Sequence, residues 1–391
     1  LLYIKKMAEN YIYKQYKNDK NFSISHNYLS NQFKDYKTIF SKIEKIIKFN
    51  DFTLGKEVEI FEKNISKLLK TKYVVSVGSG TDALMLSLKA LGVKDGDEVI
   101  TSPYTFYATI GAIVTAGAKP VFVDINYDYN IDPDQIEKKI TKKTKAILPI
   151  HWSGKICNME KILKISKRYN IPVVEDSCHG ILATRKKKLA GTFGDFGCFS
   201  LHPLKNLNVW GDGGFIVLKN KNDYKKIKLL RNHGLVGRNT NLLFGYNSRL
   251  DTVQACVANH LLKKIKFITK KRIENAAYLD KKFKNNSNLI LKPKEVFSKD
   301  VYHLYELRVK KLNLRDSLIK FLQKNKIDAK IHYPVPMHLQ PAAKVYGYKK
   351  GDFLNTEIVA SSTLSLPVHE FITRRDLDFI VKKINKFFDE N

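Results

Sequence analysis

Lys205 lies in a segment whose composition suits a reactive amine. It follows the apolar run 196–201, and Gly211, Gly213 and Gly214 come soon after it. A lysine on a loop after a buried strand can be desolvated, which lowers the pKa of its ammonium group and frees the amine to attack a carbonyl. Such an amine can form a Schiff base and can also move a proton. Because Lys and Arg together number 69, an ordinary solvated lysine is the competing interpretation.

A carboxylate and an imidazole follow a second apolar run, residues 171–175. Asp176 ends this run and His179 comes three residues later. A carboxylate at the end of a buried strand is costly unless a cation meets it. In a pyridoxal phosphate site, such an aspartate keeps the ring nitrogen protonated and strengthens the electron sink. His179 would then face the phenolic oxygen of the ring. The alternatives are an aspartate that caps a helix and an ordinary histidine at a helix start.

A glycine turn follows the β-branched run 73–77 and precedes a helical pattern. Its sequence is Gly78-Ser79-Gly80-Thr81. Glycines let the backbone approach an anion, and the free N–H groups of a helix N-terminus attract one. The turn lacks the lysine and spacing of a Walker loop and the spacing of a dinucleotide-binding turn. The pattern therefore favours a cradle for a single phosphate group, with a merely tight connection as the alternative.

The elements that must position these groups alternate along the chain. Helical patterns separate short apolar runs, which indicates an α/β domain with a mostly parallel, seven-stranded sheet covered on both faces. In such sheets, ligands bind at the carboxyl ends of the strands, where the three groups above are found. The predicted strands are 73–77, 98–101, 120–124, 146–151, 171–175, 196–201 and 214–218.

We expect three parts in the chain. Residues 1–26 are polar and tyrosine-rich and resemble an added extension, and residues 27–268 form the large cofactor-binding domain. A long lysine-rich helix over about 263–284 then leads into a smaller α+β domain, residues 269–391.

The net charge of +31 favours a polyanionic small substrate. The lysines are spread along the whole chain, whereas a nucleic-acid module would gather them with aromatic residues on one element, so we expect no nucleic-acid partner. No apolar run is long enough to cross a membrane. The four cysteines form no CxxC pair, and the chain's first residues lack a secretory pattern, so we expect no metal site and a cytoplasmic location.

Together the motifs resemble the DegT/DnrJ/EryC1/StrS family of sugar aminotransferases, over about residues 28–390. The resemblance implies the type I fold of enzymes that depend on pyridoxal 5'-phosphate, with a large and a small domain. It rests on FTLGKEVEIFEK at 52–63, GSGTDAL at 78–84, TSPYTFYAT at 101–109, GAKPVFVDI at 117–125, EDSCHG at 175–180, FGDFGCFSLHPLKNL at 193–207 and GYNSRLDTVQA at 245–255.

The resemblance also implies roles for individual residues. Lys205 would bind the cofactor covalently, Asp176 would hold its ring nitrogen and His179 would lie beside its ring oxygen. An asparagine at position 247 would reach the cofactor phosphate of a neighbouring subunit, which implies a homodimer with shared sites. The other implied cofactor contacts are Gly80, Thr81 and Ser200 at the phosphate and Phe106 on the face of the ring.

Three further residues are candidates for contact with a substrate: His151, Arg249 and His332. The segments around His151 and His332 face the substrate in similar proteins. A structural salt bridge is the alternative for Arg249, and packing against Tyr333 is the alternative for His332.

The reaction implied by the resemblance moves an amino group from glutamate to a keto sugar. Some family members carry histidine in place of the lysine and catalyse a dehydration, so Lys205 favours transamination. Residues 331–341 resemble members that aminate 3-keto sugar nucleotides. We therefore expect a nucleotide-linked 3-keto or 4-keto deoxyhexose, made for cell-surface polysaccharide or amino-sugar biosynthesis. A keto sugar phosphate, a keto cyclitol and a non-catalytic regulatory relative remain alternatives.

Overall fold

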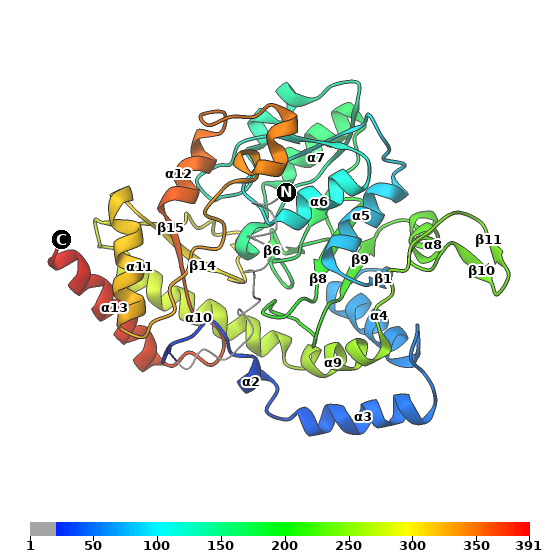
Figure 1. Ribbon diagram of the computed structural model, residues 1–391, viewed down its shortest axis with the longest axis horizontal. Helices are drawn as coiled ribbons and strands as arrows, with labels where there is room; N and C mark the ends of the chain where they lie inside the picture. Colours follow the sequence, from blue (N-terminus) through cyan, green and yellow to red (C-terminus); the bar gives the residue numbers. More distant parts are fainter. Residues whose placement is uncertain (1–20) are drawn as a thin grey trace, which may run out of the picture.

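The computed structural model describes residues 21–391, in which helices surround one large sheet and one small sheet (Figure 1), and two further sheets consist of very short strands. In this part of the chain, no helix combines the length and the apolar character needed to cross a membrane. Of the predicted extension, residues 1–26, the first twenty lie outside the described residues. Its last residues are docked, because Ile24 is buried and forms a parallel bridge with Ile327.

The large sheet consists of two parts joined edge to edge. Parallel bridges between Ile147 and Val173 and between Ile150 and Asp176 connect the two parts. Strand β9 runs antiparallel to both of its neighbours, and every other pairing in the sheet is parallel. The α/β fold with a mostly parallel sheet is thus confirmed. The strand order is β1 (Tyr73–Val77), β9 (Gly214–Leu218), β8 (Phe196–Ser200) and β5 (Val174–Asp176) in one part, and β3 (Lys119–Phe122), β2 (Glu98–Thr101) and β4 (Thr144–Ile147) in the other.

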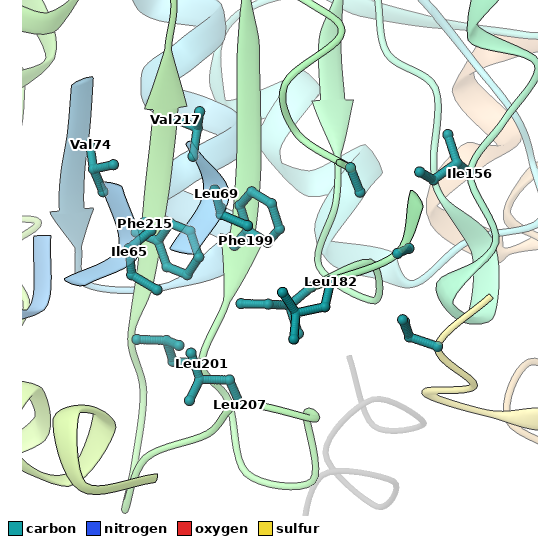
Figure 2. Close-up of a cluster of buried hydrophobic side chains, with 14 of the residues drawn as sticks. Ile65, Leu69, Val74, Ile156, Leu182, Phe199, Leu201, Leu207, Phe215 and Val217 are labelled. Carbon is teal, nitrogen blue, oxygen red and sulfur yellow. The ribbon is translucent and has the colours of Figure 1, made fainter. Parts of the chain in front are cut away.

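Helices cover both faces of this sheet because its strands are apolar on both sides. Phe215 and Val217 belong to one buried cluster, and their neighbours Ile216 and Leu218 belong to the other. Figure 2 shows part of the first cluster, where Ile65 lies beside the strand residues. The helices of the first face are α3 (Tyr36–Lys48), α4 (Lys56–Leu69), α7 (Met159–Tyr169) and α9 (Thr252–Leu262), and those of the second are α5 (Gly80–Ala90), α6 (Tyr107–Thr115) and α8 (Lys221–Leu230).

The small sheet carries a third buried cluster. It is antiparallel, in the order β12 (Leu289–Leu291), β14 (Tyr305–Val309) and β15 (Thr363–Leu366). The helices α10 (Ile265–Phe283), α11 (Arg315–Lys324) and α13 (Arg374–Asp389) pack against it.

The long helix α10 belongs to both halves of the molecule. Ile265 and Ile268 pack in the first cluster of the large sheet, whereas Ala276, Leu279 and Phe283 pack in the cluster of the small sheet. The boundary predicted at 268/269 therefore falls inside one continuous helix.

Short elements complete the fold. Two of them, β10 (Leu235–Gly237) and β11 (Thr240–Asn241), form a hairpin. The others are α2 (Leu29–Gln32), η1 (Pro133–Gln135), η2 (Glu137–Lys139), η3 (Trp152–Gly154), β6 (Thr184–Arg185), β7 (Lys188–Leu189), β13 (Ser298–Lys299), η4 (Leu312–Leu314), η5 (Met337–Leu339), η6 (Pro341–Tyr346) and α12 (Leu354–Ser362).

Candidate active site

A cavity of about 980 Å³ lies at the carboxyl ends of β1, β5 and β8. This is the edge of the sheet at which ligands bind in open α/β folds. The loops after these strands bring together residues that are more than a hundred positions apart in sequence. The predicted site residues that line the cavity are Gly80, Thr81, Phe106, Asp176, His179, Ser200, Lys205 and His332.

Lys205 lies in the loop between β8 and β9. Its backbone N–H donates to the carbonyl of His202 at 3.1 Å, and the preceding residue, Leu204, has a left-handed φ of 73°. Burial lowers the pKa of the Lys205 ammonium group, and the nearby Cys178 and Asp176 oppose this effect. Desolvation therefore raises the share of the neutral amine, which is the form that attacks a carbonyl.

Asp176 ends β5 and is 5% exposed. Its Oδ2 accepts a hydrogen bond from Thr109 Oγ1 at 2.9 Å, and its Oδ1 accepts one from the backbone N–H of Cys178 at 3.2 Å. A turn follows Asp176, so the carboxylate does not cap a helix. The side chain is held in place by these two donors and lines the cavity, where a cationic ligand atom would meet it.

His179 is almost fully buried, and its ring lies 4.2 Å from the ring of His303. Burial holds the pKa of His179 well below its usual value, so the ring is neutral near pH 7. Its Nδ1 accepts a hydrogen bond from the backbone N–H of Ser153 at 3.3 Å. A neutral imidazole with an accepting Nδ1 carries its proton on Nε2, so His179 offers a hydrogen-bond donor.

The glycine turn begins α5 in the way expected of an anion cradle. Ser79 caps the helix, and its Oγ accepts from the backbone N–H of Asp82 at 3.0 Å. A Cβ on Gly80 would lie 2.6 Å from Cβ of Ser200 and 3.1 Å from Sγ of Cys178. Only glycine fits this close approach of α5 to the end of β8, which leaves the helix N-terminus open to the cavity.

An aromatic wall faces this cradle. Phe106 is 48% exposed, and the centroid of its ring lies 6.0 Å from that of Tyr333. Tyr333 in turn lies 4.9 Å from Trp152, whose Nε1 donates to Oε2 of Glu306 at 2.8 Å. The exposed ring of Phe106 offers a face on which a flat ligand can stack.

The three candidate substrate residues have different positions. His332 lines the cavity, its Nδ1 lies 2.9 Å from Ser365 Oγ, and burial lowers its pKa to about 3. His151 does not line the cavity. It is 0% exposed, its Nε2 lies 2.7 Å from Oε2 of Glu175, and its Nδ1 accepts from the backbone N–H of Cys157. This burial corrects the expectation that His151 contacts a substrate directly.

Asn247 and Arg249 lie outside the cavity of their own chain. Asn247 is exposed and its backbone pairs with that of Asn232. Arg249 donates from Nη1 to Oδ1 of Asn232 at 3.2 Å. Within one subunit, Asn247 therefore does not reach the cofactor phosphate site and Arg249 does not reach the substrate site.

Sequence reasoning missed several residues that shape the site. Thr109 was within reach, because it belongs to the motif TSPYTFYAT; its Oγ1 lies 2.7 Å from Oγ1 of Thr105. Trp152, which follows the predicted strand 146–151, and Tyr333, which follows His332, were also within reach. The others carry no local signal, because distant segments bring them to the cavity: His26, Tyr28, Arg272 and His303.

Comparison with known proteins identifies relatives that cover most of the chain. The model of the DegT/DnrJ/EryC1/StrS aminotransferase family matches residues 34–385. A pleiotropic regulatory protein of Geobacillus stearothermophilus is 37% identical over 92% of this chain and 97% of its own length. The dTDP-3-amino-3,6-dideoxy-alpha-D-galactopyranose transaminase of Aneurinibacillus thermoaerophilus is 36% identical over 90% of this chain and 95% of its own length. The crystal structure of NtdA from Bacillus subtilis with bound PMP, 30% identical, superposes with a TM-score of 0.87 over 96% of this chain and 87% of that one.

Proposed function

The chain belongs to the DegT/DnrJ/EryC1/StrS aminotransferase family, and from this membership we propose that it moves an amino group from glutamate to a nucleotide-linked keto sugar. It is a sugar aminotransferase that depends on pyridoxal phosphate. We propose glutamate as the amino donor. We propose a 3-keto or 4-keto deoxyhexose, linked to a nucleotide, as the acceptor. The observation that carries it is the convergence of Lys205, Asp176 and Gly80 on one cavity.

The residues around the cavity fit the cofactor. The contact between Gly80 and Ser200 opens an anion cradle that a Cβ would fill, and the amine and the carboxylate lie in the same cavity. When bound, pyridoxal phosphate supplies an electron sink that accepts the electron pair of a broken C–H bond next to an amino group. The N–H groups at Gly80 and Thr81 and the hydroxyl of Ser200 would bind its phosphate.

The side chains then have separate tasks in the reaction. The Asp176 carboxylate would keep a proton on the ring nitrogen, and the Nε2–H of His179 would donate to the ring oxygen. The amine of Lys205 would act first as a general base and then as a general acid. It would take a proton from the reacting carbon of the substrate and return it to the carbon on the other side of the imine nitrogen. Its lowered pKa suits this base role near neutral pH.

The size and lining of the cavity support a substrate larger than an amino acid. Its volume of about 980 Å³ is at the upper end of the range of small-molecule sites, which leaves room for a sugar beside the cofactor. Arg272 and Lys330 also line the cavity, each paired with a carboxylate, Glu370 at 4.0 Å and Asp328 at 3.1 Å. The name of the Aneurinibacillus relative, a transaminase of a 3-amino sugar on dTDP, supports a nucleotide-linked substrate.

We further propose a homodimer in which two copies share their active sites. The hairpin β10–β11 projects from the molecule beyond α8 (Figure 1) and displays Val236, Leu242 and Phe244, which are 55%, 67% and 96% exposed. Exposed apolar groups gathered in this way are typical of interaction surfaces. Asn247 comes three residues after Phe244, so a copy seated on this hairpin would receive Asn247 near its own site.

The experiment that tests the function combines a substrate panel with one substitution. Protein loaded with pyridoxal phosphate is incubated with glutamate and, in turn, 3-keto and 4-keto nucleotide sugars, keto sugar phosphates and a keto cyclitol, and the aminated product is identified by mass. We expect amination of a nucleotide-linked keto sugar.

The matched substitution is Lys205→Ala, with the exposed Lys320→Ala as control. Lys205→Ala should abolish turnover and the visible absorption of the bound cofactor, whereas Lys320→Ala should change neither. Turnover by Lys205→Ala would refute the role of the lysine. Cofactor binding without amination of any substrate would favour a regulatory relative, as the name of the Geobacillus protein suggests for that protein.

A further inference from the structure

The N-terminal segment Tyr28–Gln32, which comprises α2 and the residue before it, contacts the loop that carries Lys205. This segment lies before residue 34, where the match to the family model begins. It is separated from Lys205 by more than 170 positions in sequence, yet Tyr28 and Gln32 are only 3% and 4% exposed. Buried polar side chains are kept where their hydrogen bonds are satisfied, so their partners show what the segment does.

The first contact joins Tyr28 to the backbone carbonyl of Leu204, the residue before Lys205. The hydroxyl of Tyr28 donates to the carbonyl oxygen of Leu204 at 3.2 Å and accepts from Nη2 of Arg272 at 2.6 Å. Leu204 has a φ of 73°, a left-handed conformation that a branched side chain adopts only when its surroundings impose it. The hydroxyl of Tyr28 is one of the groups that hold this conformation.

The second contact fixes the carbonyl of Lys205 itself. Nδ2 of Asn208 donates to the carbonyl oxygen of Lys205 at 2.9 Å and to Oε1 of Gln32 at 2.8 Å. Nε2 of Gln32 donates to Oε1 of Glu370, also at 2.8 Å. Asn208 is fully buried, so its amide is oriented by the two acceptors of Nδ2, of which Gln32 is one.

The two contacts belong to one buried network. Nε of Arg272 lies 4.0 Å from Oε2 of Glu370, which links the partner of Tyr28 to the partner of Gln32. Tyr28 also stacks on His369 with a ring distance of 4.6 Å. The segment therefore holds the backbone on both sides of Lys205 from a single, internally connected set of groups.

We propose that Tyr28 and Gln32 are positioning residues of the active site, which fix the Leu204 and Lys205 carbonyls and so aim the lysine amine. This inference rests on the proposed role of Lys205. A displacement of about 1 Å in a reacting group lowers rates by about 100-fold, so the loop needs such an anchor.

The test uses two substitutions that remove the contacts and keep the volumes, Tyr28→Phe and Gln32→Met. Each should lower kcat about 10- to 100-fold and change the KM for the keto sugar much less, since neither change removes the amine. The pH at which the visible band of the bound cofactor changes form should also shift, which is a readout that does not depend on turnover. The double variant should lose much less than the product of the two single effects, because the residues act as a unit.

Tyr305→Phe is the matched control. Its hydroxyl is equally buried and donates to Oδ1 of Asp280 at 2.8 Å, but it does not line the cavity. It should lower the unfolding temperature and leave the spectrum and kcat unchanged. Tyr28→Phe and Gln32→Met proteins that keep the wild-type spectrum, its pH dependence and kcat would overturn the inference. If one variant fails to fold, the other decides. A wild-type protein without a cofactor band would refute the proposed function instead.

Discussion

At the scale of single residues, burial acts in the same direction on Lys205 and His179. It lowers the pKa of both side chains and so favours their neutral forms. For the lysine the neutral form is the nucleophile and base, and for the histidine it is a donor with a fixed tautomer. One physical effect thus prepares two different functions, and the partners of each group decide which function it has.

Asp176 provides the first prediction. Asp176→Asn keeps an acceptor for the hydroxyl of Thr109 but removes the negative charge, so the ring nitrogen of the cofactor would no longer stay protonated. We expect the rate at which glutamate bleaches the visible band to fall at least about 100-fold. Asp212→Asn is the control, because Asp212 also lines the cavity but lies on an exposed loop. A near-normal bleaching rate for Asp176→Asn would contradict the role of the carboxylate.

Most of the residues predicted correctly to line the cavity follow strands, and most of those missed come from other segments. Lys205, Asp176 and Gly80 could be found because strand ends meet at one edge of a parallel sheet. His151 also follows a strand, but its side chain is buried beside Glu175 and does not reach the cavity. The position at the end of a strand does not tell whether the side chain enters the site or the core. The contacts of Tyr28 and Arg272 depend on how the small sheet packs against the large one, and no local pattern reports that packing.

At the scale of elements, the approach of α5 to the end of β8 depends on one glycine. Gly80→Ala would place a Cβ 2.6 Å from Ser200 Cβ, so the helix or the strand must move. We expect an affinity for pyridoxal phosphate at least about 10-fold lower and a loss of about 1–3 kcal/mol in unfolding free energy. A cofactor titration and urea unfolding measure the two effects.

Gly111→Ala is the matched control for this change. Gly111 is inside helix α6, and a Cβ there would have no heavy atom within 4 Å. It should leave cofactor affinity unchanged and add up to about 1 kcal/mol of stability, since alanine loses less entropy on folding. A Gly80→Ala protein with unchanged affinity would show that α5 does not form the phosphate cradle.

The residues that join the N-terminal segment to the small sheet should respond to acid. Burial lowers the pKa of His26, His332 and His369 to about 3, with additional contributions from Lys330 and Arg272. The unfolded chain takes up protons on these rings below about pH 6.5, whereas the folded chain does not until near pH 3. Their contribution to stability is therefore complete above pH 6.5 and is lost as the pH falls from there toward 3.

Urea unfolding at two pH values tests this dependence. From pH 7.5 to pH 5.5 the unfolding free energy should fall by on the order of 1 kcal/mol for each of the three histidines. His369→Gln should make the dependence shallower, and the exposed His233→Gln should leave it unchanged. Equal unfolding free energies at the two pH values would disprove the linkage.

The boundaries of elements were predictable to within a few residues, whereas the division into domains at 268/269 stays a prediction. The helical pattern over 263–284 is seen as α10, Ile265–Phe283. Its first turns pack on the large sheet and its last turns on the small one, so this single helix joins the two parts. Residues after 300 also return to the large sheet, as Val301 and Phe353 do.

At the scale of the whole molecule, the shared site can be tested by mixing two inactive proteins. Lys205→Ala lacks the amine and Asn247→Ala lacks the group proposed to serve the other copy. If Asn247 acts across the dimer, a hybrid contains one intact site, and random reassociation should restore about a quarter of wild-type activity. If Asn247 acts within its own chain, the mixture stays inactive, which would contradict the shared site.

The hairpin variant Leu242→Ser/Phe244→Ser is expected to weaken this dimer, because both apolar side chains are exposed in the single chain. Sedimentation should show monomers with little activity. Val296 is also exposed and lies near β13, so the Val296→Ser protein should remain dimeric. An active monomer would refute the requirement for a second copy.

The docking of the N-terminal segment has a consequence for engineering by recombination. Ile24 pairs with Ile327, the backbone N–H of His26 donates to Asp328, and His369 bonds to the carbonyl of Ser25. A chimera could take the C-terminal third from a relative in order to acquire the sugar preference of that relative. Its N-terminal segment would then no longer match the residues that it contacts there. The segment around residues 24–32 and the C-terminal third should therefore be exchanged together.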